Sequence, residues 1–590
     1  MTKHLFLFTI TPVQSFVMQA RKAQDFHVAS RILSNLTASA LNEAVALNPE
    51  CDIIFPHPDI DSMPNRFMAI VENDDINKFG ENLKKHVEND FKNQVDEAFK
   101  DIFSNQPPLN YEFQRDNYLS ISWAATEYDS NNYQQKYKEL ESILGGTKNI
   151  RSFLQLPETE KGRKCSLCGE RNAIVFIDKK LHGFQKDSVL IPPNSKNFYL
   201  MKLGEGLCTI CGFKRFSKVG GSYKSTSDIA LLHTIADINK KKEEIKEEKI
   251  KEGEYDPQYL VMLKEESYDK KEFEHLDYSL KEKTEKLSKF IKDHEIPLTP
   301  YYALMAFDGD SMGETLGGGK LKAGEDLKTF QQELSKHLGN FAKAVCSEIK
   351  KDEGQVVFAG GEDFLGFVNL NSLFSVMQRL RTLFDEKVHG ELAEKLESDK
   401  KLSFSAGIVV AHVKTPLATV IGMSREMEKV AKEIEGKDSF AIAVMKHSGE
   451  INQASFKWKD KNGYFLTDAV SNLTEKIEKN NLSSTFMSFL EKEFSPIMSK
   501  EGIVEISVVK NTNFKEMLQN ELKRTLKRSI QQGNAEKKEK KYKEIVPWIE
   551  TMINNSTEKT AIEEIKLSNL FNVFHIIDFM ARERGGNDEN

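Results

Sequence analysis

The order of strands and helices between residues 301 and 447 limits the possible folds more than any other feature of the sequence. Four apolar runs have the length and residue types of strands: "YYALMAF", "QVVFA", "FLGFVNL" and "LSFSAGIVVAHV". Apolar residues recur with helical spacing in 325–351 and 372–398. The segment therefore has the order β-α-β-β-α-β, and a further helix and a strand at 439–447 follow it.

The N-terminal segment has the same order. The runs "HLFLFTI", "CDIIFP", "NRFMAIV" and "YLSISWA" predict strands, and 12–47 and 75–103 predict the helices. We interpret both segments as ferredoxin-like units, the arrangement of polymerase palms and nucleotidyl cyclases, and therefore as an internal duplication. Where the second copy carries acids in "LMAFDGD", the first has threonines in "LFLFTIT".

The stretch "FAGGEDFLGF" places two adjacent carboxylates, Glu362 and Asp363, in a turn between two predicted strands. Adjacent carboxylates repel each other, and either solvation or a bound divalent cation with oxygen ligands offsets that repulsion. The preceding glycines, Gly360 and Gly361, allow a tight turn and the close approach of a phosphate. An ordinary hairpin would explain the glycines but not the acids.

Asp308 should join this turn, because the first strand of a ferredoxin-like unit ends beside the central hairpin. Asp308, Glu362 and Asp363 would then form a three-carboxylate cluster. Such a cluster can hold two metal ions roughly 3.5–4 Å apart, as an in-line nucleotidyl transfer requires. Asp310 is expected to support the site through the following glycine-rich loop, although coordination by Asp310 is the alternative.

Two Cys-x-x-Cys pairs, Cys165 with Cys168 and Cys208 with Cys211, are each followed by glycine. Their spacing is typical of thiolate knuckles around a tetrahedral zinc ion, and four thiolates leave no open position for catalysis. We therefore expect a structural zinc site. Disulfide bonds are the alternative, but nothing in the sequence indicates a secreted chain.

The predicted fold class is α+β, with two ferredoxin-like palm domains, a zinc-knuckle and helical insertion, and a helical C-terminal domain. Helical periodicity from residue 451 onward predicts the last domain. The predicted regions are a degenerate first palm at 1–125, a zinc-knuckle region at 126–215, a helical or linker region at 216–297, a catalytic second palm at 298–450, and helices at 451–590.

Composition gives no global sign of nucleic-acid binding, because 83 basic and 90 acidic residues leave a net charge of −7. The basic helix face of Lys523, Arg524, Lys527 and Arg528 could contact RNA or could be a solvated surface. No run of about 18 apolar residues predicts a membrane span. The N-terminal run lacks the features of a signal peptide, so a cytoplasmic protein is expected.

Six motifs occur in a fixed order: "FTITPVQSFVMQARKAQDFHVASRILS", "PNRFMA", "MAFDGDSMG", "FAGGEDFLGF", "SAGIVVAHVKTPL" and "GKDSFAIAVMKHSGE". Together with the two cysteine pairs, they resemble the large subunit of type III CRISPR–Cas effector complexes of the Cmr type (III-B). The resemblance extends from residue 1 to about 450, and the predicted C-terminal helices are compatible with it. The second palm is also similar to GGDEF cyclases.

The resemblance implies a role in antiviral defence within a ribonucleoprotein complex of other Cmr-type subunits, crRNA and target RNA. In this family target RNA switches on the conversion of ATP, usually to cyclic oligoadenylates, and some members join AMP to S-adenosylmethionine. By position, Asp308, Glu362 and Asp363 would bind two Mg²⁺ or Mn²⁺ ions. Ser405 would contact adenine and Lys437 the triphosphate, although Lys437 could be a surface lysine at a helix end.

Two features depart from the family pattern. Many members begin with an HD nuclease domain, whereas no adjacent His-Asp pair occurs in this sequence. We therefore expect no cleavage of single-stranded DNA by this subunit. The family turn is commonly Gly-Gly-Asp-Asp, and the longer Glu362 must adjust its geometry because Mg²⁺ demands ligand distances near about 2.0–2.1 Å. GGDEF-type cyclases tolerate Glu there.

Three functions remain open from the sequence. The chain is an RNA-activated nucleotidyltransferase using ATP, a non-catalytic scaffold for crRNA and target RNA, or a stand-alone GGDEF-like cyclase using GTP. The complete set of Asp308, Glu362 and Asp363 disfavours the scaffold. The duplicated palm and the cysteine pairs disfavour the stand-alone cyclase.

Overall fold

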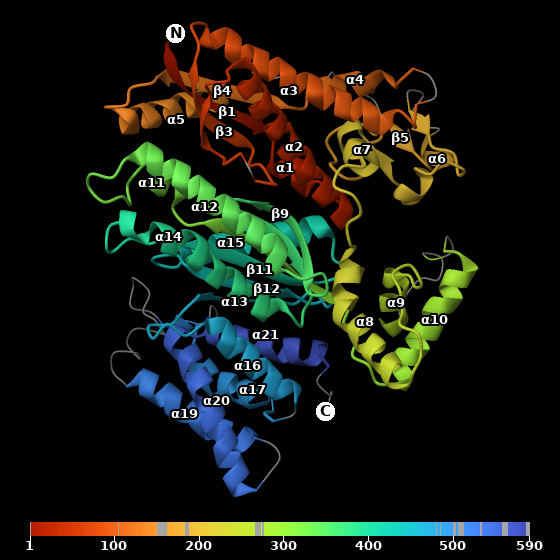
Figure 1. The fold of residues 1–590 in the computed structure, drawn as a ribbon. Helices are drawn as coiled ribbons and strands as arrows, with labels where there is room; N and C mark the ends of the chain where they lie inside the picture. Colours follow the sequence, from red (N-terminus) through yellow and green to blue (C-terminus); the bar gives the residue numbers. More distant parts are fainter. Residues whose placement is uncertain are drawn as a thin grey trace.

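The computed structural model contains two large β-sheets with helices around and between them, and two smaller sheets (Figure 1). It describes residues 2–585 except 59, 104–105, 150–161, 183–187, 266–272, 274–275, 480, 484, 500–502, 505–512, 531–533 and 557–564. No helix of these described residues has both the length and the apolar character of a membrane span.

Four antiparallel strands form the first sheet: β1 (Lys3–Thr11), β2 (Asp52–Phe55), β3 (Arg66–Glu72) and β4 (Ser120–Glu127). The order across the sheet is β2-β3-β1-β4. Successive side chains of β1 enter two cores, because Phe6 and Phe8 pack under the helices whereas Leu5 and Leu7 face the second half of the chain. The helices of this part are α3 (Ile76–Phe99), α4 (Leu109–Asp116) and α5 (Tyr133–Asn149).

The helix predicted over 12–47 is interrupted, and it forms α1 (Gln14–Met18) and α2 (Ala23–Leu47). Two tertiary features hold the interruption. The buried Lys214 donates hydrogen bonds to carbonyl oxygens at the end of α1. The Asp25 carboxylate accepts hydrogen bonds from the two N–H groups that precede α2. The prediction of one continuous helix was wrong because helical periodicity does not report such distant partners.

Six strands form the second sheet, in the order β13-β12-β11-β8-β10-β9. All neighbours are antiparallel except β11 and β12, which are parallel. The four consecutive strands β9-β10-β8-β11, which begin at one edge, repeat the order of the first sheet, in agreement with the repeated element order in the sequence. The strands are β8 (Tyr301–Gly309), β9 (Gly354–Gly360), β10 (Asp363–Val368), β11 (Phe404–His412), β12 (Ser439–Met445) and β13 (Ile451–Lys457).

The helices of the second half lie on both faces of this sheet, and α12 lies between the two sheets (Figure 1). The hydroxyl of Tyr133 on α5 donates to Oε1 of Gln331 on α12 at 2.5 Å, which ties the two halves together. The helices are α11 (Met312–Leu316), α12 (Leu327–Glu348), α13 (Leu373–Phe384), α14 (Gly390–Leu392) and α15 (Leu417–Glu433).

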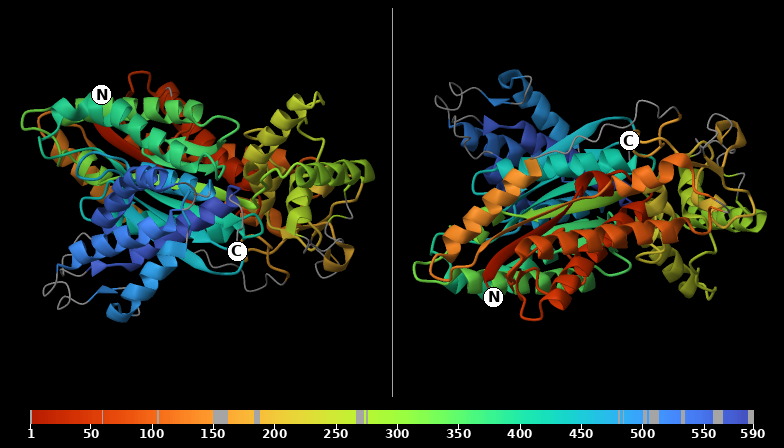
Figure 2. Two further views of the ribbon diagram at one scale, coloured as in Figure 1. Left: turned by 90° about the horizontal axis from the view of Figure 1, so that it is seen from below. Right: turned by 90° about the horizontal axis from the view of Figure 1, so that it is seen from above.

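The insertion between the two sheets lies at one end of the molecule (Figure 2). Its cysteine-containing part has three short strands in the order β6-β5-β7 and a buried helix, α7. Three longer helices with their own small core follow. The elements are β5 (Val175–Phe176), α6 (Lys179–His182), β6 (Val189–Leu190), β7 (Gly206–Leu207), α7 (Thr209–Phe216), α8 (Thr226–Glu244), α9 (Pro257–Glu265) and α10 (Tyr278–Asp293).

The C-terminal part is mainly helical, but it begins with β13 rather than with a helix as the sequence predicted. The second sheet therefore extends past the predicted boundary at residue 450. Side chains of Asn569 and Asn572 bond to backbone groups of β13 and so cover its open edge. The remaining elements are α16 (Leu466–Glu478), α17 (Thr485–Phe494), β14 (Ile503–Val504), α19 (Phe514–Ser529), α20 (Ala535–Ser556), β15 (Ile565–Lys566) and α21 (Ser568–Glu583).

Candidate active site

The turn between β9 and β10 forms the hairpin that the sequence predicted, but its loop has two residues rather than the four of Gly-Gly-Glu-Asp. Gly360 pairs with Asp363, which leaves Gly361 and Glu362 as the loop. Gly361 has a φ of 84°, a conformation that favours glycine and that type II′ hairpin turns require at this position. The turn therefore places Glu362 and Asp363 at the end of the hairpin.

Asp308 lies at the end of β8, which is the neighbour of β10 in the sheet. Its carboxylate shares a side-chain hydrogen bond with Asp363. A Cβ atom added to the next residue, Gly309, would come within 2.9 Å of the Cβ of Glu362, so only glycine allows this approach of the turn to the strand. The sheet thus brings together the three acids that the sequence singled out.

The three carboxyl groups have divergent pKa values. Desolvation, the hydrogen bond to Asp308 and the charges of Asp308 and Glu362 raise the pKa of Asp363 well above its usual value. Desolvation and the Asp308 charge also raise the pKa of Glu362. Desolvation opposes ionisation of Asp308 too, but the hydrogen bond with Asp363 and the nearby Lys432 hold its pKa below the usual value. This is the pattern of like charges that share one site.

Lys432 is a cation that sequence reasoning missed. Its ammonium group pairs with the Asp308 carboxylate and lies 3.2 Å from Oε1 of Glu428, one helical turn earlier on α15. The ammonium thus offsets part of the charge of the acids.

Within the described residues, four cysteines are the only group of three or more His, Cys, Asp or Glu side chains whose ligand atoms all lie within 4.8 Å of one another. The three acids are therefore more widely spaced than those cysteines.

A pocket of about 150 Å³ adjoins the acidic turn. One wall comes from the first half of the chain and includes Pro56 and Arg66, and the other comes from α11, α12 and the turn itself. Most lining side chains are apolar, as in pockets that hold small organic ligands. The acids thus lie where both halves of the chain contribute to one recess.

Asp310 and Ser405 do not face this pocket. Asp310 is buried, and its two carboxylate oxygens accept hydrogen bonds from the Ser405 hydroxyl at 2.8 Å and the Ser403 hydroxyl at 2.7 Å. The Asp310 carboxylate thus bonds to Ser405 of β11 and to Ser403 just before it, and its carbonyl oxygen accepts a hydrogen bond from Lys320 of the glycine-rich loop. Ser405 is fully buried, so its hydroxyl is not available to adenine in this arrangement.

Lys437 follows the end of α15, and its ammonium donates a hydrogen bond of 2.9 Å to the hydroxyl of Ser311. Ser311 lies just beyond the end of β8, three residues after Asp308. The Lys437 side chain therefore reaches toward the strand end that carries Asp308, as a triphosphate ligand at this site would have to do.

The four cysteines of the two pairs form the cluster described above. Sulfur atoms around one tetrahedral zinc ion at about 2.3 Å would be about 3.8 Å apart. The sulfurs of Cys168 and Cys208 are 3.8 Å apart, and all four thiols are free. The donor set and its spacing therefore fit structural zinc and contradict disulfide bonds.

The basic face of α19 is largely neutralised within the chain. Lys523 pairs with Glu550, and Lys527 pairs with Glu539. Arg524 pairs with Glu521 on its own helix and with a second glutamate on α17. These pairs favour the interpretation of a solvated, ion-paired surface over an RNA contact.

Comparison with known proteins finds a family-model match in each half of the chain. Residues 301–441 match the family model of the second palm domain of Cas10/Cmr2. Residues 5–62 match the model of the N-terminal part of the CRISPR-associated protein Cmr2. A curated relative, the CRISPR system Cmr subunit Cmr2 of Pyrococcus furiosus, is 25% identical over 670 aligned residues, which cover 93% of this chain and 72% of the relative.

Two solved structures share the fold over nearly the whole chain. A chain of the type III-B Cmr-beta complex in its apo state has a TM-score of 0.67 at 16% identity, covering 98% of this chain and 82% of that chain. A chain of the Cmr-beta complex bound to cognate target RNA has a TM-score of 0.66 at 14% identity, with 98% and 83% covered.

The second sheet and its acidic turn are thus a palm domain of the Cas10/Cmr2 class. With the N-terminal match and the similarity along the chain, the protein is similar to the Cmr2 subunit of Cmr-type CRISPR systems. This confirms the family resemblance stated from the sequence.

Proposed function

We propose that this chain is an RNA-activated nucleotidyltransferase that converts ATP into a signalling nucleotide, a cyclic oligoadenylate. The observation that carries the proposal is the meeting of Asp308, Glu362 and Asp363 at the hairpin turn of the palm, beside a pocket that both halves of the chain line. Transfer of AMP to S-adenosylmethionine by the same site is the alternative product.

In the proposed reaction, a ribose hydroxyl of one nucleotide attacks the α-phosphorus of ATP. A new P–O bond forms, and the bond to pyrophosphate breaks. Asp308, Glu362 and Asp363 would hold two Mg²⁺ or Mn²⁺ ions, which supply the clamp on the attacking and leaving oxygens. Asp363 would act as a ligand in its ionised form, and its raised pKa makes metal binding there dependent on pH. Gly360 and Gly361 would leave room for the phosphates.

Lys437 would bind the triphosphate as a point charge from the opposite side of β8 to the hairpin. The pocket beside the turn would hold the nucleotide and limit its contact with water. The first sheet, which has threonines in place of the acids, would act as a degenerate palm that completes this pocket. The four cysteines would hold one structural zinc ion away from the chemistry.

The proposed setting is a cytoplasmic type III-B complex with other Cmr-type subunits, crRNA and target RNA. The related Cmr-beta chain in a complex with cognate target RNA supports this setting, since it has the same fold. The net charge of −7 and the pairing of the basic α19 face indicate that other subunits hold most of the RNA.

The test is to incubate the assembled complex with labelled ATP or GTP, with and without target RNA, and to identify the products by mass. We expect an ATP-derived product only with target RNA, and little product from the isolated chain. Equal activity of the isolated chain without RNA would contradict the proposed activation. A complex that binds target RNA but makes no product would be a scaffold, and preferential use of GTP would favour a GGDEF-like cyclase.

Replacing Lys432 by Met should make stability more dependent on Mg²⁺. Without metal, the change removes the cation that pairs with Asp308, so the acids repel one another more strongly. With metal, bound ions would offset that repulsion. We expect a lower thermal midpoint in EDTA and a larger rise on addition of Mg²⁺ than in the unmodified chain.

Lys429→Met is the matched control, because Lys429 is exposed on the same helix and pairs only with Glu433, at 4.0 Å, among the residues described. Its Mg²⁺ response should equal that of the unmodified chain. An unchanged Mg²⁺ response in the Lys432→Met variant would show that Lys432 and metal ions do not offset the same repulsion between the acids.

A further inference from the structure

The turn that follows α15 has an unusual backbone. Gly436, Lys437 and Asp438 are all left-handed, with φ angles of 69°, 49° and 51°. Residues other than glycine rarely adopt this conformation, because their Cβ atoms approach the following carbonyl oxygen. Two such residues in succession persist only where the surrounding structure holds them, and strain of this kind gathers at functional sites.

A charged network holds the Asp438 end of this turn. The carboxylate of Asp438 accepts hydrogen bonds from Nη2 of the buried Arg381 at 2.7 Å and from its Nε at 2.9 Å. Lys401 pairs with the same carboxylate. On the other side, the Lys457 ammonium donates hydrogen bonds to the backbone carbonyl oxygens of Glu435 and Lys437. The turn is thus fixed through both its side chain and its carbonyl groups.

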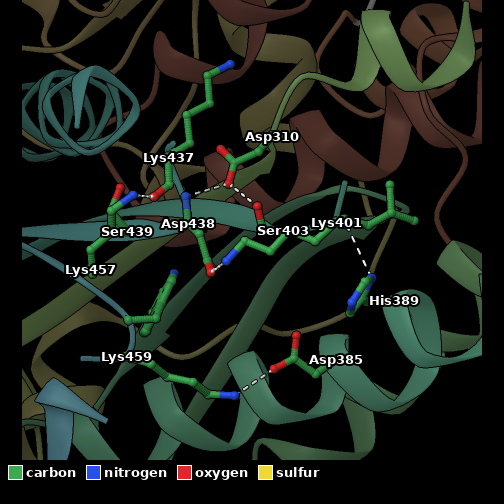
Figure 3. A network of polar contacts seen from close by, with 12 residues as sticks. Asp310, Asp385, His389, Lys401, Ser403, Lys437, Asp438, Ser439, Lys457 and Lys459 are labelled. Atoms are coloured by element: carbon green, nitrogen blue, oxygen red, sulfur yellow. Dashed lines mark hydrogen bonds and ion pairs between the residues drawn. The ribbon is translucent and has the colours of Figure 1, made fainter. Parts of the chain in front are cut away.

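Asp310 joins this turn to the end of β8. Its carboxylate accepts a hydrogen bond of 3.0 Å from the backbone N–H of Asp438 and one from the hydroxyl of Ser403, just before β11 (Figure 3). It also accepts one from Ser405 of β11. The residue after Asp310, Ser311, is also left-handed, with a φ of 55°, and it accepts the hydrogen bond from Lys437. Figure 3 shows the Lys437 side chain extending away from the network that holds its backbone.

We propose that Asp310, Arg381 and Lys457 are positioning residues, which hold the 436–438 turn so that the Lys437 ammonium lies where it binds a nucleoside triphosphate. This inference rests on the proposed function and deepens it, since it names the residues that set the position of the triphosphate ligand. The side-chain groups of all three bond to the turn itself, so they act through the turn and not on substrate directly.

The network is better suited to positioning than to stability alone. A turn without left-handed residues would connect α15 and β12 without needing buried charges to hold it. The buried charges instead hold the turn in one conformation. Lys437, whose ammonium would bind a phosphate, lies within that turn. A flexible lysine at this place would lose more conformational entropy on binding.

The experiment measures binding of a non-transferable ATP analogue, α,β-methylene-ATP, to the full chain with Mg²⁺, together with KM and kcat of the assembled complex. Lys457→Met keeps the apolar stem of a half-buried residue and removes the two hydrogen bonds to the turn. We expect it to raise the Kd and KM about tenfold, with kcat within about twofold, because it removes binding but not chemistry. Arg381→Lys should have a smaller effect than Arg381→Gln.

A double-mutant cycle with Lys437→Ala separates positioning from general destabilisation. If Lys457 acts through Lys437, then Lys457→Met should have no further effect on Kd in the Lys437→Ala background. Arg379→Gln is the control, since Arg379 lies on the same helix as Arg381 but pairs with Glu348 and Glu353. Its Kd should be unchanged.

The possible outcomes distinguish this inference from the proposed function. A weaker Kd in Lys437→Ala but not in Lys457→Met or Arg381→Lys would overturn the positioning role alone. Fully additive effects, or a lower thermal midpoint with unchanged Kd, would do the same. An analogue that binds the unmodified chain and Lys437→Ala equally would overturn the triphosphate role of Lys437, and no binding to the unmodified chain would overturn both.

Discussion

Asp363→Asn should reduce product formation by the assembled complex by at least about 100-fold, a loss of roughly 2.7 kcal/mol of transition-state stabilisation. Asp363 shares a hydrogen bond with Asp308 at the end of the hairpin, where the proposed metal ions have to bind. A neutral amide is a poor ligand for a hard cation. The attacking hydroxyl would lose its activation, and the triphosphate would lose its clamp. The measurement is the initial rate with saturating target RNA.

The same change should raise the stability of the metal-free chain. The pKa of Asp363 is raised in the folded protein, chiefly by desolvation and by Asp308. The ionised form therefore destabilises the folded state, and this cost appears as pH rises from the ordinary carboxyl pKa through the raised value. In EDTA, the thermal midpoint of the unmodified chain should fall across this range relative to that of Asp363→Asn.

Glu362 is the more informative position, because Glu replaces the Asp that is common in the family. Glu362→Asp should keep metal binding and change the rate or the product, since the shorter side chain retains a carboxylate. Glu362→Gln should lose most activity. Asp352→Asn, an exposed change at the start of the same hairpin, is the control and should leave the rate unchanged. An Asp363→Asn, Glu362→Gln double variant that assembles and works at the wild-type rate would sink the proposed site.

The two sheets were predictable because their strands are short apolar runs in a repeated order. Hydrophobic periodicity reports which segments are buried, and the order of elements then restricts how they pair. The strand β13 was missed because its three buried positions are Asn452, Ala454 and Phe456, which do not make an apolar run, and its edge is covered by asparagines from α21, more than 100 residues later. The break between α1 and α2 was missed for the same reason, since Lys214 that stabilises it comes from a distant helix.

The acids and the cysteines were predictable because their chemistry is visible in a short window of sequence. Two adjacent carboxylates in a glycine turn, or two Cys-x-x-Cys pairs, are unusual without a ligand. Lys432, Arg381 and Asp438 carry no such local signal, because lysine, arginine and aspartate are ordinary on helices and turns. Their partners are brought together only by the sheet. Ser405 was a prediction in the other direction. It lies on a strand near the site and was expected to contact the nucleotide, but it is buried against Asp310.

The cysteine cluster affects more than its own short strands. Cys208 caps the start of α7, and α7 packs against α2 and α3 of the first half of the chain. Arg215 of α7 forms buried ion pairs with Asp25 at 2.6 Å and with Glu205 at 3.1 Å. Lys214, beside it, holds the end of α1. Both side chains depend on the position of α7, and the cysteine cluster fixes the first turn of that helix. Loss of metal should therefore disturb the junction of α1 and α2 as well.

Cys208→Ser should lower the thermal midpoint of the full chain by roughly 5 °C or more and should remove bound zinc, because a structural zinc site contributes directly to folding. Elemental analysis of the native protein should find one zinc ion per chain, with Zn–S distances near about 2.3 Å by X-ray absorption. Cys346→Ser is the control, since Cys346 is exposed and lies outside the cluster. It should change neither zinc content nor midpoint.

Native protein without zinc, or a Cys208→Ser variant as stable as Cys346→Ser, would show that the four thiols are held together by packing alone. Amide hydrogen exchange provides a second measure, because metal loss should increase exchange at the start of α2, where the backbone N–H groups bond to Asp25.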